Sequence, residues 1–341
     1  LTPDLLCSTT PVVLRGLIKD WPLVLQANLS NQAAQSYLRH HYNQNKVRAF
    51  MADAKHQGRF FYNDDLSGFN FNPTTTTFDK VLDNLAEYEE LPKPPGLYMG
   101  STAVDHILPE FRSKNDLPAF VDKPLISIWV GNQSKIAAHY DVTDNIACVA
   151  AGKRRFTLFP PNQLDNLYIG PLDFTPAGQP ASLVDVTQPD LIKYPKFAQA
   201  MQHAQVAELE AGDAIFIPSM WWHHVEGLSR FNVLVNYWWR QVDTQIGAPM
   251  DALNHALLCI RDLPKVQRDV CRDLFEYYIF APQEQNHIPK DKRWVLNPID
   301  EHLSRKPFPY TLLTLPTIYV LQILFFVISI HTSYFILHHL Y

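Results

Sequence analysis

The chain has 341 residues, of which 47% are hydrophobic and 18% are charged. This composition indicates a globular protein, and the length fits one large domain or two small ones. The 29 basic and 34 acidic residues give a net charge of −5, which argues against a nucleic-acid binder held by phosphate neutralisation. The four cysteines lie far apart with no Cys-X-X-Cys pair. Neither a structural zinc site nor a disulfide framework is therefore expected, and a reducing, cytoplasmic compartment fits best.

Residues 1–95 are expected to form an N-terminal α/β segment that packs on the core. A strand-like run at residues 11–15 precedes a helical stretch at 31–42. Apolar side chains at helical spacing predict a second helix at 78–90. The Pro- and Gly-rich run after this helix leads into a strand at 97–99.

The spacing of apolar residues changes between residues 96 and 245. Short strand-like runs at 125–130, 155–159, 214–217 and 232–238 are separated by Pro, Gly and Asn. Many short strands with turn signals between them favour a β sandwich or barrel. We therefore expect a mainly β core in this part of the chain.

Helical spacing returns in residues 246–306. Apolar residues form one stripe through Leu253 and Ile260 and another through Val266 and Leu274, with a proline between the two. This pattern predicts a helical hairpin appended to the β core, with apolar faces that need a covering surface.

The last segment, residues 307–341, contains no Asp, Glu, Lys or Arg. Residues 317–337 are apolar enough and long enough to cross a bilayer as a helix. Gln322 and His331 interrupt this stretch, and no basic residue follows it to fix a topology. Three interpretations are open: residues that are not native to the fold, a tail anchor in a membrane, or a buried core helix. At the other end, the chain begins with Leu1, and no signal-peptide pattern is visible.

Two motifs in the β region carry side chains that bind metals. His139 and Asp141 are two residues apart, and on a strand such residues face the same side. A later run, Gly-Asp-Ala-Ile-Phe-Ile-Pro-Ser-Met-Trp-Trp, is followed by His223 and His224. Strand pairing that joins one of these histidines to the first motif would form a 2-His-1-carboxylate triad. Such a triad leaves positions open on Fe(II) for a bidentate co-substrate and dioxygen.

Each motif also has a purely structural interpretation. His-X-Asp occurs by chance in many proteins, and histidines after two tryptophans can be half-exposed edge residues. The coincidence of both motifs within one series of short strands favours the metal site. Neighbouring residues on a strand face opposite sides, so only one of His223 and His224 can be a ligand.

Several stretches carry a family resemblance. Residues 11–16, 58–62, 68–71, 129–141 and 152–161 resemble the Jumonji-C, cupin-like family of Fe(II)- and 2-oxoglutarate-dependent oxygenases, and within it the asparaginyl hydroxylases. The likeness runs from about residue 10 to about residue 303 and leaves out the uncharged tail.

The resemblance implies a double-stranded β-helix, or jelly-roll, core over residues 96–245. It also implies that His139, Asp141 and His223 bind Fe(II), since the family's ligand is the first histidine after the tryptophan pair. His224 is then expected to face outward or to support a ligand. The implied reaction is hydroxylation with 2-oxoglutarate and dioxygen as co-substrates. Demethylation is the same chemistry on an N-methyl group, and the choice between the two is open.

Four further residues match positions that bind 2-oxoglutarate in the family: Tyr98, Asn145, Arg154 and Asn236. Arg154 stands where the similar hydroxylases have a lysine for the distal carboxylate, and Lys153 beside it is the alternative. Arg154 is favoured because it shares a strand face with Phe156 and Leu158. An arginine can bind a carboxylate through two parallel hydrogen bonds, so the role can be kept.

Two other positions bear on this pocket. Ile136 stands where the family has a threonine that donates a hydrogen bond, so the chain lacks one donor to the co-substrate. Trp238 falls at a tryptophan position near the active site, although a core aromatic residue is an equally good interpretation.

The resemblance also implies partners. Residues 246–306 resemble the segment through which similar hydroxylases dimerise, so a homodimer is expected. The substrate is expected to be a protein side chain or a small molecule, with nucleic acid unlikely and a membrane partner only if the tail is a native anchor. The alternative function is a metal-binding cupin-like protein without 2-oxoglutarate turnover, either of isomerase type or a non-catalytic binding module.

Overall fold

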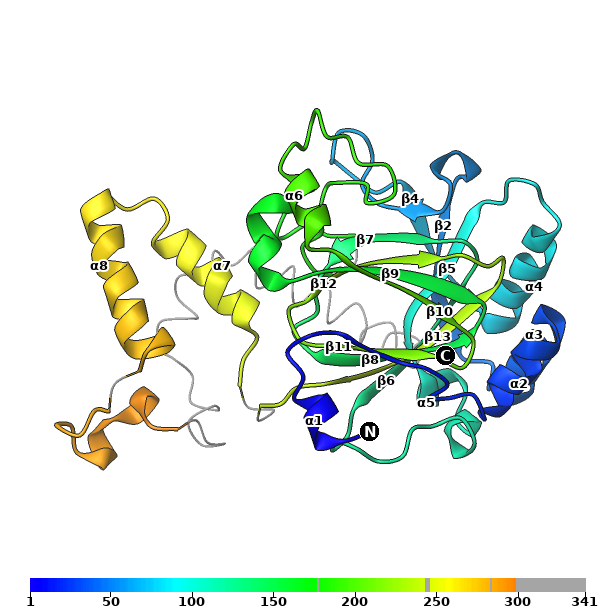
Figure 1. Ribbon diagram of the computed structural model, residues 1–341, viewed down its shortest axis with the longest axis horizontal. Coiled ribbons are helices and arrows are strands. Elements are labelled where there is room, and N and C mark those ends of the chain that lie inside the picture. The colour runs from blue at the N-terminus through cyan, green and yellow to red at the C-terminus, as the bar shows by residue number, and fades with distance from the viewer. Residues whose placement is uncertain (177, 243–245, 283, 299–341) are drawn as a thin grey trace, which may run out of the picture. The chain divides into compact units, whose positions relative to one another are not determined.

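The computed structural model describes residues 1–298 except 177, 243–245 and 283 (Figure 1). The chain divides into two compact units, Leu1–Gln241 and Val242–Tyr341. The first unit holds two β-sheets and the second is helical where it is described. The prediction of a mainly β fold with N-terminal α/β elements and a C-terminal helical hairpin is confirmed.

The larger sheet has eight strands and runs through the middle of the first unit. All of its neighbouring strands pair antiparallel. In spatial order the strands are β1 (Val12–Leu14), β11 (Ala214–Ile217), β8 (Asp144–Ala151), β13 (Asn232–Trp239), β6 (Leu125–Gly131), β5 (Gly96–Ala103), β2 (Lys46–Ala52) and β4 (Phe71–Thr77).

The smaller sheet has five strands and faces the larger one. Its spatial order is β10 (Gln205–Glu210), β9 (Lys153–Phe159), β12 (Trp222–Gly227), β7 (Lys135–His139) and β3 (Arg59–Phe60). The chain passes from the larger sheet to the smaller one at Gly152, between β8 and β9. Gly152 has a φ of +76°, and a Cβ there would lie 2.4 Å from the carbonyl oxygen of Phe231, so this turn requires a glycine.

Side chains from both sheets meet in an inner cluster. It contains Ala147 and Val149 of β8, Phe156 and Leu158 of β9, and Leu234 of β13, with further members from β10, β11 and β12. Residues two apart on a strand share a face, so these members identify the inner face of each strand.

The opposite face of the larger sheet is covered by helices of the N-terminal part (Figure 1). They are α2 (Pro22–Leu29), α3 (Asn31–His41), α4 (Phe78–Glu89) and α5 (Val104–Ile107). The hydroxyl of Ser30 caps α3 by accepting the N–H of Ala33, and Thr77 caps α4 in the same way from Lys80. The helices predicted at 31–42 and 78–90 are therefore confirmed. Two short helices, α1 (Pro3–Leu6) and α6 (Phe197–Gln202), complete the first unit.

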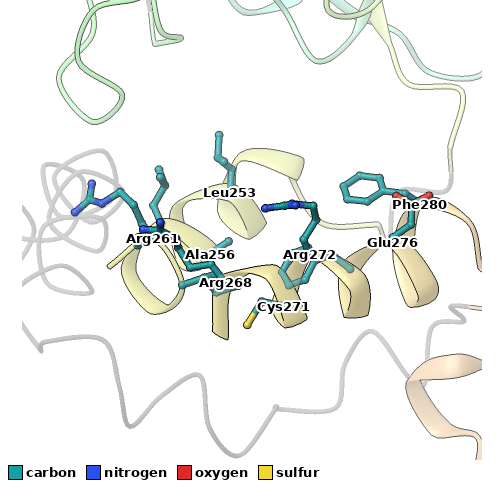
Figure 2. Close-up of a pocket in the computed structure, with 11 residues that line it drawn as sticks. Leu253, Ala256, Arg261, Arg268, Cys271, Arg272, Glu276 and Phe280 are labelled. Atoms are coloured by element: carbon teal, nitrogen blue, oxygen red, sulfur yellow. Dashed lines mark hydrogen bonds between the residues drawn. The ribbon is translucent and has the colours of Figure 1, made fainter. Parts of the chain in front are cut away.

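The second unit contains α7 (Pro249–Cys259) and α8 (Lys265–Phe275), followed by a π-helical turn at Glu276–Phe280. An open groove lies between the two helices, lined by apolar residues such as Leu253, Ile260 and Phe275 (Figure 2). Among the residues described, no helix combines the length and the apolar character needed to cross a membrane. The uncharged segment 307–341 lies outside the described residues, so its three interpretations stay predictions.

Candidate metal centre

The pairing of β7 with β12 brings the two histidine motifs together. His223 is the partner of His139, and Val225 is the partner of Ile136, so three steps on β7 match two steps on β12. This β-bulge places His139 and Ile136 on the same face although they are an odd number of residues apart. Val225 belongs to the inner cluster, and both histidines therefore face the space between the sheets.

Three ligand-type side chains converge at this end of the strands. The ligand atoms of His139, Asp141 and His223 all lie within 4.8 Å of one another, and the described part of the chain holds no other group of three metal-binding side chains. Nε2 of His223 lies 3.7 Å from a carboxylate oxygen of Asp141, and the two imidazole centroids are 4.4 Å apart. Two imidazole nitrogens and one carboxylate oxygen form a donor set that suits Fe(II).

Both histidines are oriented by their second ring nitrogen. Nδ1 of His139 lies 2.8 Å from the carbonyl oxygen of Ala137, and Nδ1 of His223 lies 2.9 Å from that of Trp221. A carbonyl only accepts, so Nδ1 is the donor in each ring, and in the neutral form of the ring Nε2 carries the lone pair. The atoms left free to bind a metal are therefore those that face Asp141.

Burial favours the neutral, metal-binding form of His223. Its side chain is 5% exposed. Burial, followed by the electrostatic interaction with His139, lowers the pKa of His223 from its ordinary value of 6.5 to about 4. The nearby carboxylate of Asp141 opposes this shift but does not outweigh it. His223 is thus uncharged at neutral pH, as a ligand must be.

Two details differ from the expectation for these motifs. His139 is the last residue of β7, so Asp141 lies beyond the strand and its position does not follow from strand alternation. His224 lies on the outer side of β12, in line with the outward orientation expected, but it is buried there and only 3% exposed. Its Nε2 lies 3.8 Å from a carboxylate oxygen of Glu226.

The structure separates the two candidate cations for the co-substrate. Arg154 is 2% exposed and shares the inner face of β9 with Phe156. No hydrogen bond or ion pair joins it to another described residue, and burial lowers its pKa. Lys153 is exposed and pairs with Glu210 at 2.5 Å. Only Arg154 is therefore placed to meet a ligand between the sheets.

The predicted amide pair lies on the inner face of the larger sheet. Asn145 follows the alternation of β8 with Ala147, and Asn236 follows that of β13 with Leu234. Nδ2 of Asn236 donates to Oδ1 of Asn145 at 2.6 Å, and Oδ1 of Asn236 has no partner among the described residues. One amide oxygen thus remains to bind another donor.

Tyr98, the tyrosine predicted to line the co-substrate pocket, lies close to Arg154 and to Asp141. Burial raises the pKa of Tyr98, the charge of Arg154 opposes that shift and the charge of Asp141 adds to it. The Tyr98 hydroxyl is therefore neutral, and its ring is near both Arg154 and the carboxylate of Asp141.

Two tryptophans continue from Tyr98: Trp129 contacts Tyr98, and Trp238 contacts Trp129. Of the two, only Trp238 was predicted from the sequence to lie near the active site. Trp129 of β6 stacks on Tyr98 with ring centroids 5.7 Å apart, and it meets Trp238 edge to face at 5.7 Å. The indole N–H groups of Trp129 and Trp238 are both buried and lack an acceptor among the described residues. Ile136 packs beside Tyr98 and offers no donor. Trp129 lies within an apolar strand-like run, which gave no signal of its role.

These unpaired groups fit the co-substrate of the family. Buried donors normally have acceptors, and an unpaired buried cation is costly. Arg154 and the two indole N–H groups would be satisfied by a dicarboxylate such as 2-oxoglutarate.

Comparison with known proteins gives a consistent result. A family model described as a cupin-like domain matches residues 2–245. The lysine-specific demethylase JMJ31 of Arabidopsis thaliana is 33% identical over 138 residues, which cover 39% of this chain and 25% of that protein. The tRNA wybutosine-synthesizing protein 5 of Mus musculus is 30% identical over 164 residues, which cover 44% of this chain and 46% of that protein.

A third relative is the human HSPB1-associated protein 1, which is 28% identical over 135 residues, covering 39% of this chain and 27% of that protein. The matches thus span less than half the length of each of these three relatives. The family model covers most of the first unit, including both sheets and the three candidate ligand residues. The chain belongs to the cupin-like, JmjC-type domain family.

Proposed function

We propose that the protein is an Fe(II)- and 2-oxoglutarate-dependent oxygenase that hydroxylates a protein side chain. One observation carries the proposal: a His-Asp-His cluster within 4.8 Å and a buried, unpaired arginine face the same space between the sheets. A cupin that only bound a metal would have no use for Arg154, whose burial without a partner is costly.

The chain's own residues have distinct tasks in this reaction. His139, Asp141 and His223 would hold the metal through two Nε2 atoms and a carboxylate oxygen. Arg154 would bind the distal carboxylate of 2-oxoglutarate, with Tyr98 and the asparagine pair beside it. The chemistry supplied by the bound metal is oxidation of a substrate C–H to C–OH, coupled to conversion of 2-oxoglutarate and dioxygen to succinate and carbon dioxide.

The aromatic side chains would exclude water from this chemistry. Tyr98, Trp129 and Trp238 form a continuous series of rings along the inner face of the larger sheet. Phe156 and Leu158 lie on the inner face of the smaller sheet. An apolar enclosure strengthens the interaction between Arg154 and a carboxylate, because fewer waters compete for either charge.

A protein side chain is proposed as the substrate on family resemblance and on charge. The names of the relatives refer to lysine demethylation and to tRNA modification, so they do not agree on a substrate class. The net charge of −5 disfavours a polyanionic substrate.

The test of the proposed activity needs no substrate. The purified chain would be incubated in air with Fe(II), ascorbate and 2-oxoglutarate, and succinate would be measured by NMR. We expect slow succinate formation that is lost in His139→Ala, needs a higher 2-oxoglutarate concentration in Arg154→Met and is unchanged in Lys153→Met. Metal binding without succinate in any variant would favour the alternative, a cupin-like protein that does not turn over 2-oxoglutarate.

We also propose that the helical unit forms a homodimer. The groove between α7 and α8 exposes apolar side chains, with Arg261, Arg268 and Arg272 at its edge (Figure 2). A symmetric contact between two such grooves would bury both stripes at once. Light scattering should give twice the chain mass of 39.2 kDa.

The matched variants lie close together at the end of α7. Ile260→Asp changes a residue that lines the groove, and Leu258→Asp changes an exposed residue outside it. We expect a monomer for the first and a dimer for the second. A monomeric wild-type chain at micromolar concentration would contradict the proposed dimer.

A further inference from the structure

The segment that carries His139 and Asp141 contacts the segment that carries His223 beyond the end of the β7–β12 strand pairing. His139 ends β7, and Asp141 follows in the loop before β8. His223 comes just after the turn formed by Pro218 to Trp221. The β7–β12 pairing fixes His139 relative to His223, but it does not extend to Asp141. Another set of contacts must therefore set the position of the carboxylate.

Three hydrogen bonds provide those contacts. The main-chain N–H of Met220 donates to the carbonyl oxygen of Asp141 at 2.8 Å. The hydroxyl of Ser219 donates to the carbonyl oxygen of Val142 at 2.8 Å, and the main-chain N–H of Ser219 donates to Oδ1 of Asp144 at 2.9 Å. The loop that carries Asp141 is thus tied directly to the turn that precedes His223.

Asp144 is the side chain on which this connection depends. It is 6% exposed at the start of β8, and both of its carboxylate oxygens accept hydrogen bonds. Oδ2 accepts from Nε2 of Gln241 at 2.8 Å while Oδ1 accepts from Ser219. An asparagine could replace only one of the two acceptors, because its amide nitrogen would face the amide nitrogen of Gln241.

The turn that Asp144 holds is itself strained. Met220 has a φ of +67° although it is not a glycine. This left-handed conformation is unfavourable for an L-residue. It persists where surrounding contacts enforce it, and the bonds from Ser219 and Met220 to the Asp141 loop are such contacts.

We infer that Asp144 is a positioning residue for the metal centre: its carboxylate locks the Asp141 loop onto the 218–221 turn and so sets the spacing of Asp141 and His223 before a metal binds. The inference rests on the proposed function, since it concerns the affinity of that same site. Supporting residues of this kind typically alter metal affinity by about 10- to 100-fold when changed.

The test measures Mn(II) affinity of the full chain by EPR, without substrate or turnover. Asp144→Asn should weaken Mn(II) binding by about 10- to 100-fold. Adding Gln241→Glu to that variant should restore part of the affinity, because the amide introduced at position 144 can then donate to a carboxylate, while the bond from Nε2 of Gln241 to the carbonyl oxygen of Leu6 is lost. Gln241→Leu alone keeps the Ser219 bond and should weaken binding less, which provides a second variant if Asp144→Asn does not fold.

The matched control is Asp213→Asn. Asp213 also accepts several hydrogen bonds, from the N–H of Gly16 and from Arg15, but it ties the β10–β11 turn to the segment after β1. This variant should lower the urea midpoint and leave Mn(II) affinity unchanged. A merely structural role for Asp144 would give the same pattern as Asp213.

Two results would contradict the inference in distinguishable ways. Unchanged Mn(II) affinity in folded Asp144→Asn, or equal losses in Asp144→Asn and Asp213→Asn, would overturn the positioning role and leave the proposed function standing. No Mn(II) binding by the wild-type chain would remove the metal centre and the positioning role together.

Discussion

The metal-ligand end and the co-substrate side of the same inner space differ in how their polar groups are satisfied. At the ligand end, both imidazoles are held by main-chain carbonyls, and the loop with Asp141 is bonded to the turn before His223. On the co-substrate side, Arg154, Asn236 and two indole N–H groups retain buried polar atoms with no partner among the described residues. Under the proposed function, the first region would be organised before its metal binds, whereas the second would be completed by 2-oxoglutarate.

This difference affects the stability of the ligand-free protein. A satisfied buried network rigidifies a site, whereas unsatisfied buried groups lower stability until a partner is supplied. Changes at the ligand end should therefore abolish binding. Changes on the co-substrate side should weaken 2-oxoglutarate binding while stabilising the ligand-free protein.

The largest expected effect is the loss of metal binding on changing a ligand histidine. His223→Ala should reduce Mn(II) affinity by well over about 100-fold, more than the loss typical of a supporting residue. The adjacent histidine provides the control, because His224→Leu removes a buried ring on the outer side of β12. Mn(II) EPR would show binding in His224→Leu and none in His223→Ala. Equal losses in both variants would contradict the assignment of His223 as the ligand.

The next effect is a dependence of stability on pH at the ligand end. Burial lowers the pKa of His223 to about 4, and burial likewise lowers that of His224 to about 4. Between about pH 4 and 6.5 the unfolded chain therefore binds more protons than the folded one, so the free energy of unfolding rises with pH and levels off above this window.

Each histidine would contribute on the order of 3 kcal/mol across the full window. Urea titrations of the metal-free chain at pH 4.5 and 7 should show lower stability at pH 4.5. His223→Gln should remove about half of this dependence and leave the part that His224 contributes. A stability that stays constant across the window in the wild type would contradict the neutral, buried state of these rings.

Replacing Arg154 is expected to have two smaller effects of opposite sign: weaker 2-oxoglutarate binding and a more stable ligand-free protein. Arg154→Met should weaken 2-oxoglutarate binding by about 10- to 100-fold, because charge-assisted hydrogen bonds contribute roughly 1.5–3 kcal/mol each. The same change should raise the melting temperature of the ligand-free protein, since it removes an unpaired buried cation. Lys153→Met, which changes an exposed ion pair, should alter neither property measurably. A lower melting temperature for Arg154→Met would show that the arginine has a partner in the free protein.

Local patterns in the sequence predicted the mainly β fold, and together with the family resemblance they predicted which three side chains would come together, whereas metal binding by these side chains stays a prediction. The short strands follow from runs of apolar residues between turn signals, and His139, Asp141 and His223 do converge. Strand alternation also predicted that Arg154 lies inside, and its burial against the exposure of Lys153 agrees with this.

Local sequence patterns did not predict the features that arise from contacts between segments far apart in the chain. The β-bulge that turns His139 inward arises only from its register with His223. The burial of His224 and the bonds of Asp144 likewise need segments from other parts of the chain. Trp129 begins one of the stretches that resemble the family but was assigned no role, and its relation to Tyr98 appears only when β5 and β6 pair. The homodimer remains a prediction, and residues 307–341 lie outside the described part of the chain.

The most direct test of the proposed oxygenase is an anaerobic titration of the purified chain with Fe(II) and then 2-oxoglutarate, followed by visible absorption. The account predicts the weak charge-transfer band of a chelated 2-oxo acid, absent in His139→Ala and shifted to higher 2-oxoglutarate concentration in Arg154→Met. Fe(II) binding with no band at any 2-oxoglutarate concentration would contradict the central claim.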